Sequence, residues 1–133
     1  MSVFHDQALF MKATEQEPDA KLYRELVKEE VEKELRESWY KFMQFRSYEN
    51  EAMVADSIMD SIYVLAGMAN SLWGPDKSLT MFKEVHRSNM SKVVPVETLG
   101  GVKYAVKRRD DGKILKPASF SPPNLFQIIT GVS

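Results

Sequence analysis

The chain has 133 residues, of which 44% are hydrophobic and 28% charged, and its formal net charge is −1. This length fits one domain with a core of its own, and the composition is that of a soluble globular protein. The absence of cysteine excludes disulfides and thiolate metal sites. No apolar run approaches the ~20 residues of a membrane span, and the first residues lack a basic-then-apolar signal pattern, so we expect a cytoplasmic protein without a membrane partner.

The charge is unevenly distributed along the chain. Residues 1–60 contain 14 acidic and 8 basic side chains, whereas residues 61–133 contain 5 acidic and 10 basic ones. The first part could therefore bind cations and the second part an anion, and a metal–phosphate substrate needs both. A nucleic-acid-binding arm over residues 103–116 is a weaker reading, because the acidic first half argues against a nucleic-acid partner.

Residues 19–45 predict one long helix, because they are good helix formers and include neither Gly nor Pro. The apolar face of this helix consists of Tyr23, Val27, Val31, Leu35 and Phe42. An acidic line of Glu30, Glu34 and Glu37 runs beside this face rather than opposite it. The ordinary alternative is a solvated Glu–Lys face that only stabilises the helix.

A second helix is predicted over residues 51–72, and its apolar positions cover more than half of its circumference. So wide an apolar surface indicates a helix between neighbours or at a subunit interface. Asp56 and Asp60 share one face of it, and burying them unpaired would cost several kcal/mol, roughly. If the two helices pack together, hard divalent cations are the natural partners for both acidic stripes.

Gly74-Pro75 predicts a break, followed by a third helix that Asp76 or Ser78 could cap and that ends near Met90. Beyond Gly100 the alternation of apolar residues and lysines, with a turn signal at residues 110–112, predicts a small hairpin. Residues 124–129 predict a last short helix.

Three motifs lie at the centre of these elements. They are Leu26-Val27-Lys28-Glu29-Glu30-Val31-Glu32-Lys33-Glu34, Val54-Ala55-Asp56-Ser57-Ile58-Met59-Asp60-Ser61-Ile62-Tyr63-Val64, and Glu84-Val85-His86-Arg87-Ser88-Asn89-Met90-Ser91-Lys92 with Asp111-Gly112-Lys113-Ile114-Leu115-Lys116-Pro117. In this order and spacing the chain resembles MazG-like all-α nucleoside triphosphate pyrophosphohydrolases, of the short, phosphoribosyl-ATP pyrophosphohydrolase-like type common in bacteriophages. The likeness runs from about residue 6 to residue 129.

The resemblance implies an all-α helical bundle in a single domain, residues 1–133, with a helical core at about 19–92 and a C-terminal arm or small hairpin at about 93–133. It implies a homodimer or a dimer of dimers with sites at the subunit boundaries. The implied reaction converts a (deoxy)nucleoside triphosphate, with dGTP the first expectation, to the monophosphate and pyrophosphate. The role would be nucleotide-pool control or sanitation, in the host cytoplasm if the chain is phage-encoded.

Family members hold Mg²⁺, which Mn²⁺ can replace, on a Glu-Glu-x-x-Glu motif and a Glu-x-x-Asp motif. Here Lys33 stands where the third Glu is expected and Ser57 where the other Glu is expected, and each has a carboxylate one residue away. The implied metal ligands are Glu29, Glu30, Glu34, Asp56 and Asp60. The expected catalytic residues are Glu30 and Glu34. A carboxylate at the edge of the cluster, Glu29 or Glu34, could orient or deprotonate the attacking water.

The matching third segment of the family borders the substrate, which implies ribose or phosphate contacts for Asn89 and Lys92. Lys113 and Lys116 could fold over the triphosphate as part of a lid. The alternatives are a basic C-terminal helix cap and a solvated hairpin. The departures at Lys33 and Ser57 also leave a different function open, a catalytically degenerate helical interaction module in which Lys33, Arg24 or another basic partner, rather than a metal cation, neutralises the carboxylates.

Overall fold

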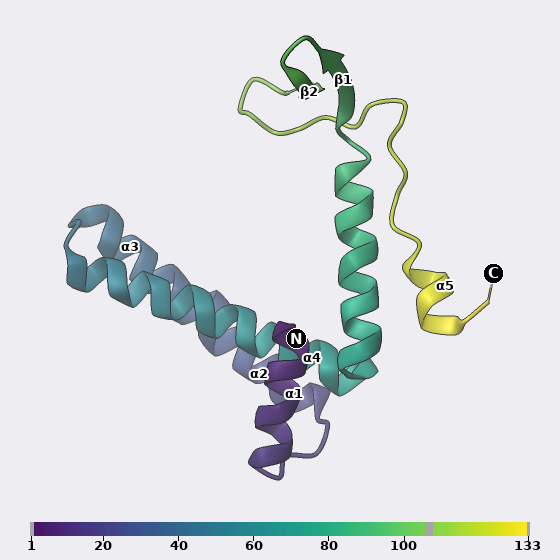
Figure 1. Ribbon diagram of the computed structural model, residues 1–133. Coiled ribbons are helices and arrows are strands. Elements are labelled where there is room, and N and C mark those ends of the chain that lie inside the picture. Colours follow the sequence, from purple (N-terminus) through teal and green to yellow (C-terminus); the bar gives the residue numbers. More distant parts are fainter. Residues whose placement is uncertain (1, 106–107, 133) are drawn as a thin grey trace. The chain divides into compact units, whose positions relative to one another are not determined.

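The computed structural model describes residues 2–105 and 108–132, and the chain is mostly helical. The elements are α1 (Val3–Ala13), α2 (Ala20–Val27), the π-helix η1 (Lys28–Leu35), α3 (Arg36–Gln44), α4 (Tyr48–Met90), β1 (Val94–Thr98), β2 (Gly101–Ala105) and α5 (Leu125–Thr130) (Figure 1). The chain divides into two compact units, Met1–Leu79 and Thr80–Ser133. Each unit is described by itself below.

The long helix predicted over residues 19–45 is confirmed, and it consists of α2, η1 and α3 in direct succession. Asp19 caps its start, since the Asp19 side chain accepts hydrogen bonds from the backbone N–H of Lys21 and of Leu22, both at 3.1 Å. The sequence did not predict that the middle of this helix, which carries the first acidic motif, is a π-helix. It also did not predict α1.

The first part of α4 runs antiparallel to the α2–η1–α3 helix (Figure 1). At one end of the pair, the Ser38 hydroxyl of α3 donates a hydrogen bond to the Ser57 hydroxyl of α4 at 3.0 Å. At the other end, the backbone N–H of Asp19 donates to the Ser71 hydroxyl at 3.3 Å. Small side chains at these contacts allow the two helices to approach closely.

A buried polar network joins α1 to this pair. The Gln7 side chain is fully buried and donates to the Tyr23 hydroxyl at 2.8 Å. The Tyr23 hydroxyl donates in turn to the side-chain oxygen Oε1 of Gln16 at 2.8 Å. The side-chain amide of Asn70 donates to the side-chain oxygen Oε1 of Gln7 at 2.9 Å. These bonds satisfy the buried polar atoms of Gln7 and Tyr23 inside the protein, so the network aligns three helices.

The predicted break between the second and third helices lies at Gly74, which has a φ of 78° and a ψ of 166°. Only glycine adopts this backbone conformation readily. The helix resumes at Pro75, a residue suited to the first helical position. Asp76 and Ser78 therefore lie inside the helix, and the prediction that either one begins it was wrong.

Helix α4 is long and apolar enough to cross a membrane by length and composition alone. A helix in the core of a soluble protein passes the same test, so this is weak support for a span. The buried polar side chains Ser57, Ser61 and Asn70 of α4 all hydrogen-bond within the protein. Cytoplasmic location stays a prediction.

In the second unit, β1 and β2 form an antiparallel hairpin in which Thr98 pairs with Gly101 and Val94 with Ala105. The tight turn falls at residues 99–100. The strand pairing of the predicted hairpin, with its turn at residues 110–112, was wrong, because β2 pairs with the preceding strand β1. The chain does turn at residues 110–112, where a single bridge joins Arg108 and Ile114. Helix α5 agrees with the predicted last helix, and the Asn124 side chain caps it by accepting from the Gln127 N–H at 3.2 Å.

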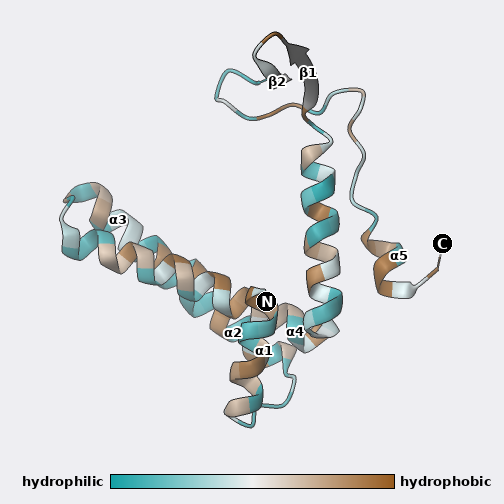
Figure 2. Ribbon diagram, in the orientation of Figure 1, coloured by the Kyte–Doolittle hydropathy of each residue, from teal (hydrophilic) through white to brown (hydrophobic). Residues whose placement is uncertain are grey.

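Many large apolar side chains of α3 and α4 are exposed. In Figure 2, which colours the ribbon by hydropathy, apolar residues recur along α4. Trp39 is 50% exposed, Met59 63% and Leu65 47%. These helices therefore offer apolar surface that a second chain could cover.

We predict that Gly67→Ala lowers the free energy of unfolding by about 3 kcal/mol, because a Cβ at Gly67 would overlap the Tyr23 ring and the Gln7 amide. Urea unfolding measures this change. Gly100→Ala is the matched control, since a Cβ there meets no atom within 4 Å. Equal stability of the two variants would contradict the close approach of α2 and α4.

Candidate functional site

Glu30 lies at the centre of the candidate site. It belongs to η1 and its side chain is half-buried. One carboxylate oxygen, Oε2, is buried and has no hydrogen-bond partner among the residues that the structure describes. A buried carboxylate oxygen without a partner is costly, so this atom has the character of an unused ligand.

Three other predicted ligands surround this carboxylate. The pKa of Glu30 is raised to about 7, chiefly by burial and then by hydrogen bonding with Glu34 and by the negative charges of Glu34, Asp60 and Asp56. The structure thus brings residues of both acidic stripes within electrostatic reach of each other. Asp60 is half-buried, whereas Glu34 and Asp56 are exposed.

The arrangement is not yet that of a closed metal site. Among the described residues, no three acidic or histidine side chains are already gathered at ligand spacing. The donors are all hard carboxylate oxygens, and one of them is buried and unpaired, so the residues present fit Mg²⁺ or Mn²⁺.

Ser57 and Lys33, the two residues that depart from the family motifs, differ in burial. Ser57 is buried and hydrogen-bonded to Ser38, so this position holds the two helices together. Lys33 is exposed. Glu29, the remaining predicted ligand, is also exposed.

A cleft of about 200 Å³ opens beside the carboxylates. It is lined by Glu34, Glu37, Ser38, Lys41, Met53, Asp56 and Ser57. Two of the predicted ligands thus face a space that also contains a cation, Lys41. The sequence analysis did not identify Lys41, which is one helical turn beyond Glu37 and could have been found by extending the acidic line.

The predicted substrate residues lie in the second unit. The Lys92 ammonium donates a hydrogen bond to the Asn89 side chain at 3.1 Å. The ammonium groups of Lys92 and Lys116 lie 5.8 Å and 4.9 Å from the centre of the Phe120 ring, so both lysines contact the same aromatic ring. Lys113 is exposed, in the turn after Asp111.

Phe120 was not identified from the sequence, although it is the one aromatic residue between Pro117 and Pro122. Hydrogen bonds of Ser91 fix this stretch against the end of α4. The Ser91 hydroxyl accepts from the Ser121 N–H at 2.8 Å, and the Ser119 hydroxyl donates to the Ser91 carbonyl oxygen at 3.2 Å. The arm is therefore tied to the helix that carries Asn89.

Comparison with known proteins adds no assignment: no protein-family model matches the chain, and no curated protein matches it. The likeness to MazG-like enzymes therefore depends on the motifs alone.

We predict that stability falls as the pH rises from about 4.5 through 7. The pKa of Glu30 is about 7 when folded and near 4.5 when unfolded, so the folded state holds the extra proton in this window. Urea unfolding at pH 5 and pH 7.5 should show that Glu30→Gln reduces this loss by about 1 to 2 kcal/mol. Exposed Glu49→Gln is the control, and equal pH dependence in the two variants would refute the role of Glu30.

Proposed function

We propose that the protein is a Mg²⁺-dependent nucleoside triphosphate pyrophosphohydrolase, which converts a (deoxy)nucleoside triphosphate to the monophosphate and pyrophosphate. One observation carries the proposal: Glu30 has a buried, unpaired oxygen in a group with Glu34, Asp56 and Asp60. Four carboxylates on two packed helices repel one another unless a cation binds between them. The motif resemblance supplies the reaction, with dGTP the first substrate to test.

In this proposal Glu30 and Asp60 are the central metal ligands, and Asp56 and Glu34 complete the set. Bound Mg²⁺ would neutralise phosphate charge and activate water. Water attacks the α-phosphorus, the bond between that phosphorus and the bridging α–β oxygen breaks, and pyrophosphate leaves. Glu34 lines the cleft, where its carboxylate can orient the water and accept its proton.

The basic side chains of the second unit are the proposed partners of the phosphates. Lys92 and Lys116 both contact the Phe120 ring, at 5.8 Å and 4.9 Å from its centre. Such a pair suits the negative charge of pyrophosphate better than separate lysines would. Lys113 would add to it from the turn, and Asn89 would contact the ribose or a phosphate.

The π-helix η1 accounts for the one-residue offset of the first motif. Hydrogen bonds in a π-helix run from residue i to i+5, so each turn takes roughly one residue more than an α-turn. A Glu-Glu-x-x-x-Glu spacing through η1 can then place Glu34 on the face where an α-helix would place the residue at position 33. The extra residue, Lys33, is accommodated without moving the helices on either side.

The alternative of a degenerate interaction module assigns Arg24 or Lys33 to the carboxylates. The Arg24 guanidinium instead pairs with Glu32 at 3.2 Å. Among the described residues, no ion pair reaches Glu30 or Asp60. In the described part of the chain no protein cation is therefore paired with Glu30 or Asp60, and a candidate nearby is Lys41, which lines the cleft with Glu34 and Asp56.

We propose in addition that the chain self-associates as a dimer or a dimer of dimers. An apolar depression of about 440 Å³ lies between η1, α3 and α4 and is lined by Val31, Leu35, Arg36, Trp39, Val54 and Ile58. Trp39 and Ile58 remain 50% and 40% exposed there. Covering this surface with a second copy would bury apolar area next to the carboxylates.

Asp60→Asn should reduce pyrophosphate release from a nucleoside triphosphate panel with Mg²⁺ or Mn²⁺ by at least about a hundredfold, because it removes a ligand charge. Exposed Asp6→Asn should retain full activity. The assay follows pyrophosphate and orthophosphate separately. Orthophosphate as the only product, or no release by the unaltered protein from any triphosphate, would refute the proposed reaction.

Deletion of Lys33 should convert η1 to an α-helix and leave Glu29, Glu30 and Glu34 at Glu-Glu-x-x-Glu spacing. We expect the shortened chain to fold and to bind Mn²⁺ within about tenfold of the original affinity. Deletion of Met59, an exposed residue in the unbroken part of α4, is the control and should unfold the chain, because no π-turn absorbs the shift. Calorimetric titration and circular dichroism measure both results, and loss of folding on Lys33 deletion would contradict the argument.

A further inference from the structure

The cleft beside the carboxylates is lined by one basic side chain, Lys41 of α3. The wall formed by the first helix consists of Glu34, Glu37, Ser38 and Lys41, which are three or four places apart, the spacing of one helix face. The wall formed by α4 consists of Met53, Asp56 and Ser57. Three carboxylates and one ammonium group thus surround a space of about 200 Å³.

The charges are separated along the cleft. Ser38 donates a hydrogen bond to Ser57, which fixes the register of the two antiparallel helices at this point. Glu34 lies one turn before Ser38 and Lys41 lies one turn after it, so these two residues are roughly 10 Å apart along the helix axis. In an antiparallel pair Asp60 then lies at the Glu34 end. The cleft therefore has an acidic end, where the predicted metal ligands gather, and a basic end.

The Lys41 ammonium group is not paired with the carboxylates that share its cleft. Glu37 precedes Lys41 by four residues, which is the order and spacing of a favourable Glu–Lys pair on a helix. In the part of the chain that the structure describes, however, no ion pair includes Lys41. Its N–H donors are therefore available to an anion in the cleft.

We propose that Lys41 couples metal binding to nucleotide binding in this cleft, an inference that rests on the proposed function. Without a nucleotide, the ammonium group repels a divalent cation held by Glu34 and Asp56. A triphosphate that accompanies the cation reverses this effect, because Lys41 then donates to a phosphate oxygen. The carboxylates, in turn, repel a triphosphate that arrives without a cation. The cleft thus selects the metal–nucleotide complex over the free metal and over the free nucleotide, and each ligand strengthens binding of the other.

The test measures two affinities of the full chain. Electron paramagnetic resonance gives the affinity for Mn²⁺ alone, and calorimetric titration at saturating Mn²⁺ gives the affinity for the α,β-imido analogue of dGTP, in which the bond to be cleaved is replaced. Lys41→Met should bind Mn²⁺ alone about fivefold more tightly. It should bind the analogue at least about tenfold more weakly. Lys41→Arg retains the charge and should keep both affinities within about twofold of the original.

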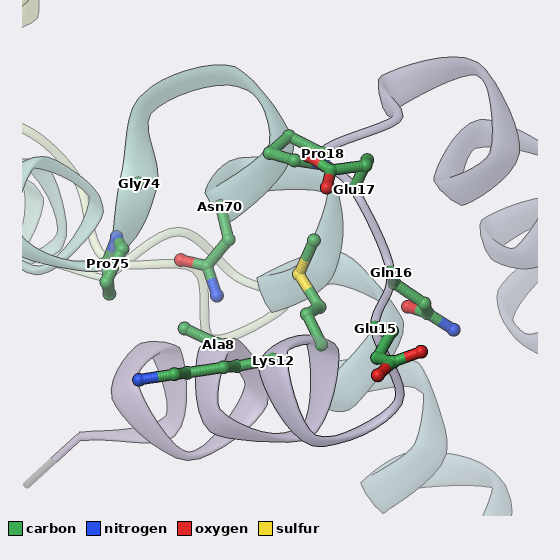
Figure 3. Close-up of a pocket in the computed structure, with 10 residues that line it drawn as sticks. Ala8, Lys12, Glu15, Gln16, Glu17, Pro18, Asn70, Gly74 and Pro75 are labelled. Carbon is green, nitrogen blue, oxygen red and sulfur yellow. The ribbon is translucent and has the colours of Figure 1, made fainter.

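Lys12→Met is the matched control. Lys12 is exposed and lines a separate pocket of about 490 Å³ between α1, the loop that follows it and α4, together with Glu15 and Glu17 (Figure 3). The lining of this pocket includes none of the predicted metal ligands. The variant therefore makes the same change in net charge, also beside carboxylates, and should bind Mn²⁺ and the analogue as the unaltered protein does.

Opposite shifts of the two affinities in Lys41→Met are the expected result. Any other result in this variant, or the same shifts in Lys12→Met, would overturn the coupling. The proposed hydrolysis would survive that outcome if the unaltered protein releases pyrophosphate. Absence of Mn²⁺ binding and of pyrophosphate release by the unaltered protein would instead refute the proposed function, and the coupling with it.

Discussion

The close packing of α4 against the α2–η1–α3 helix is the constraint on which the first unit depends. Gly67 admits the Tyr23 ring, and Ser57 meets Ser38 across the same contact. A larger residue at Gly67 would push the helices apart. That approach forces Glu30 into the neighbourhood of Asp60, so the packing that stabilises the fold also creates its largest electrostatic repulsion.

Two polar layers lie along this helix pair. They differ in whether their hydrogen bonds and charges are satisfied by other groups of the protein. The amide layer of Gln7, Tyr23 and Asn70 is hydrogen-bonded inside the protein except at one oxygen. The acidic layer has no internal cation among the described residues. Asp60 and Asn70 are ten residues apart, or roughly 15 Å along α4. A satisfied layer stabilises the fold, whereas a layer of uncompensated charge costs stability and is better explained by a ligand.

The elements predicted correctly are those with local signals. Residues 19–45 contain no helix breaker, and Gly74 interrupts the following helix. Asn124 is a favourable N-cap residue at the start of α5. The π-helix could not be predicted, because its amino acids also suit an α-helix and only packing on both sides decides where an extra residue is accommodated. Phe120 and Asn70 were missed for a related reason, since their partners lie about 30 and 60 residues away.

The sequence by itself determined the helical class, the two acidic stripes and the opposite charges of the two parts of the chain, because periodicity and charge are local properties. Only the tertiary structure decided that Glu30 is the carboxylate with a buried, unpaired oxygen and that Ser57 belongs to the helix contact. It alone decided that the side-chain carbonyl oxygen of Asn70 is buried without a hydrogen-bond partner among the described residues. Burial and hydrogen-bond satisfaction depend on which distant segments meet, and a linear pattern does not contain that information.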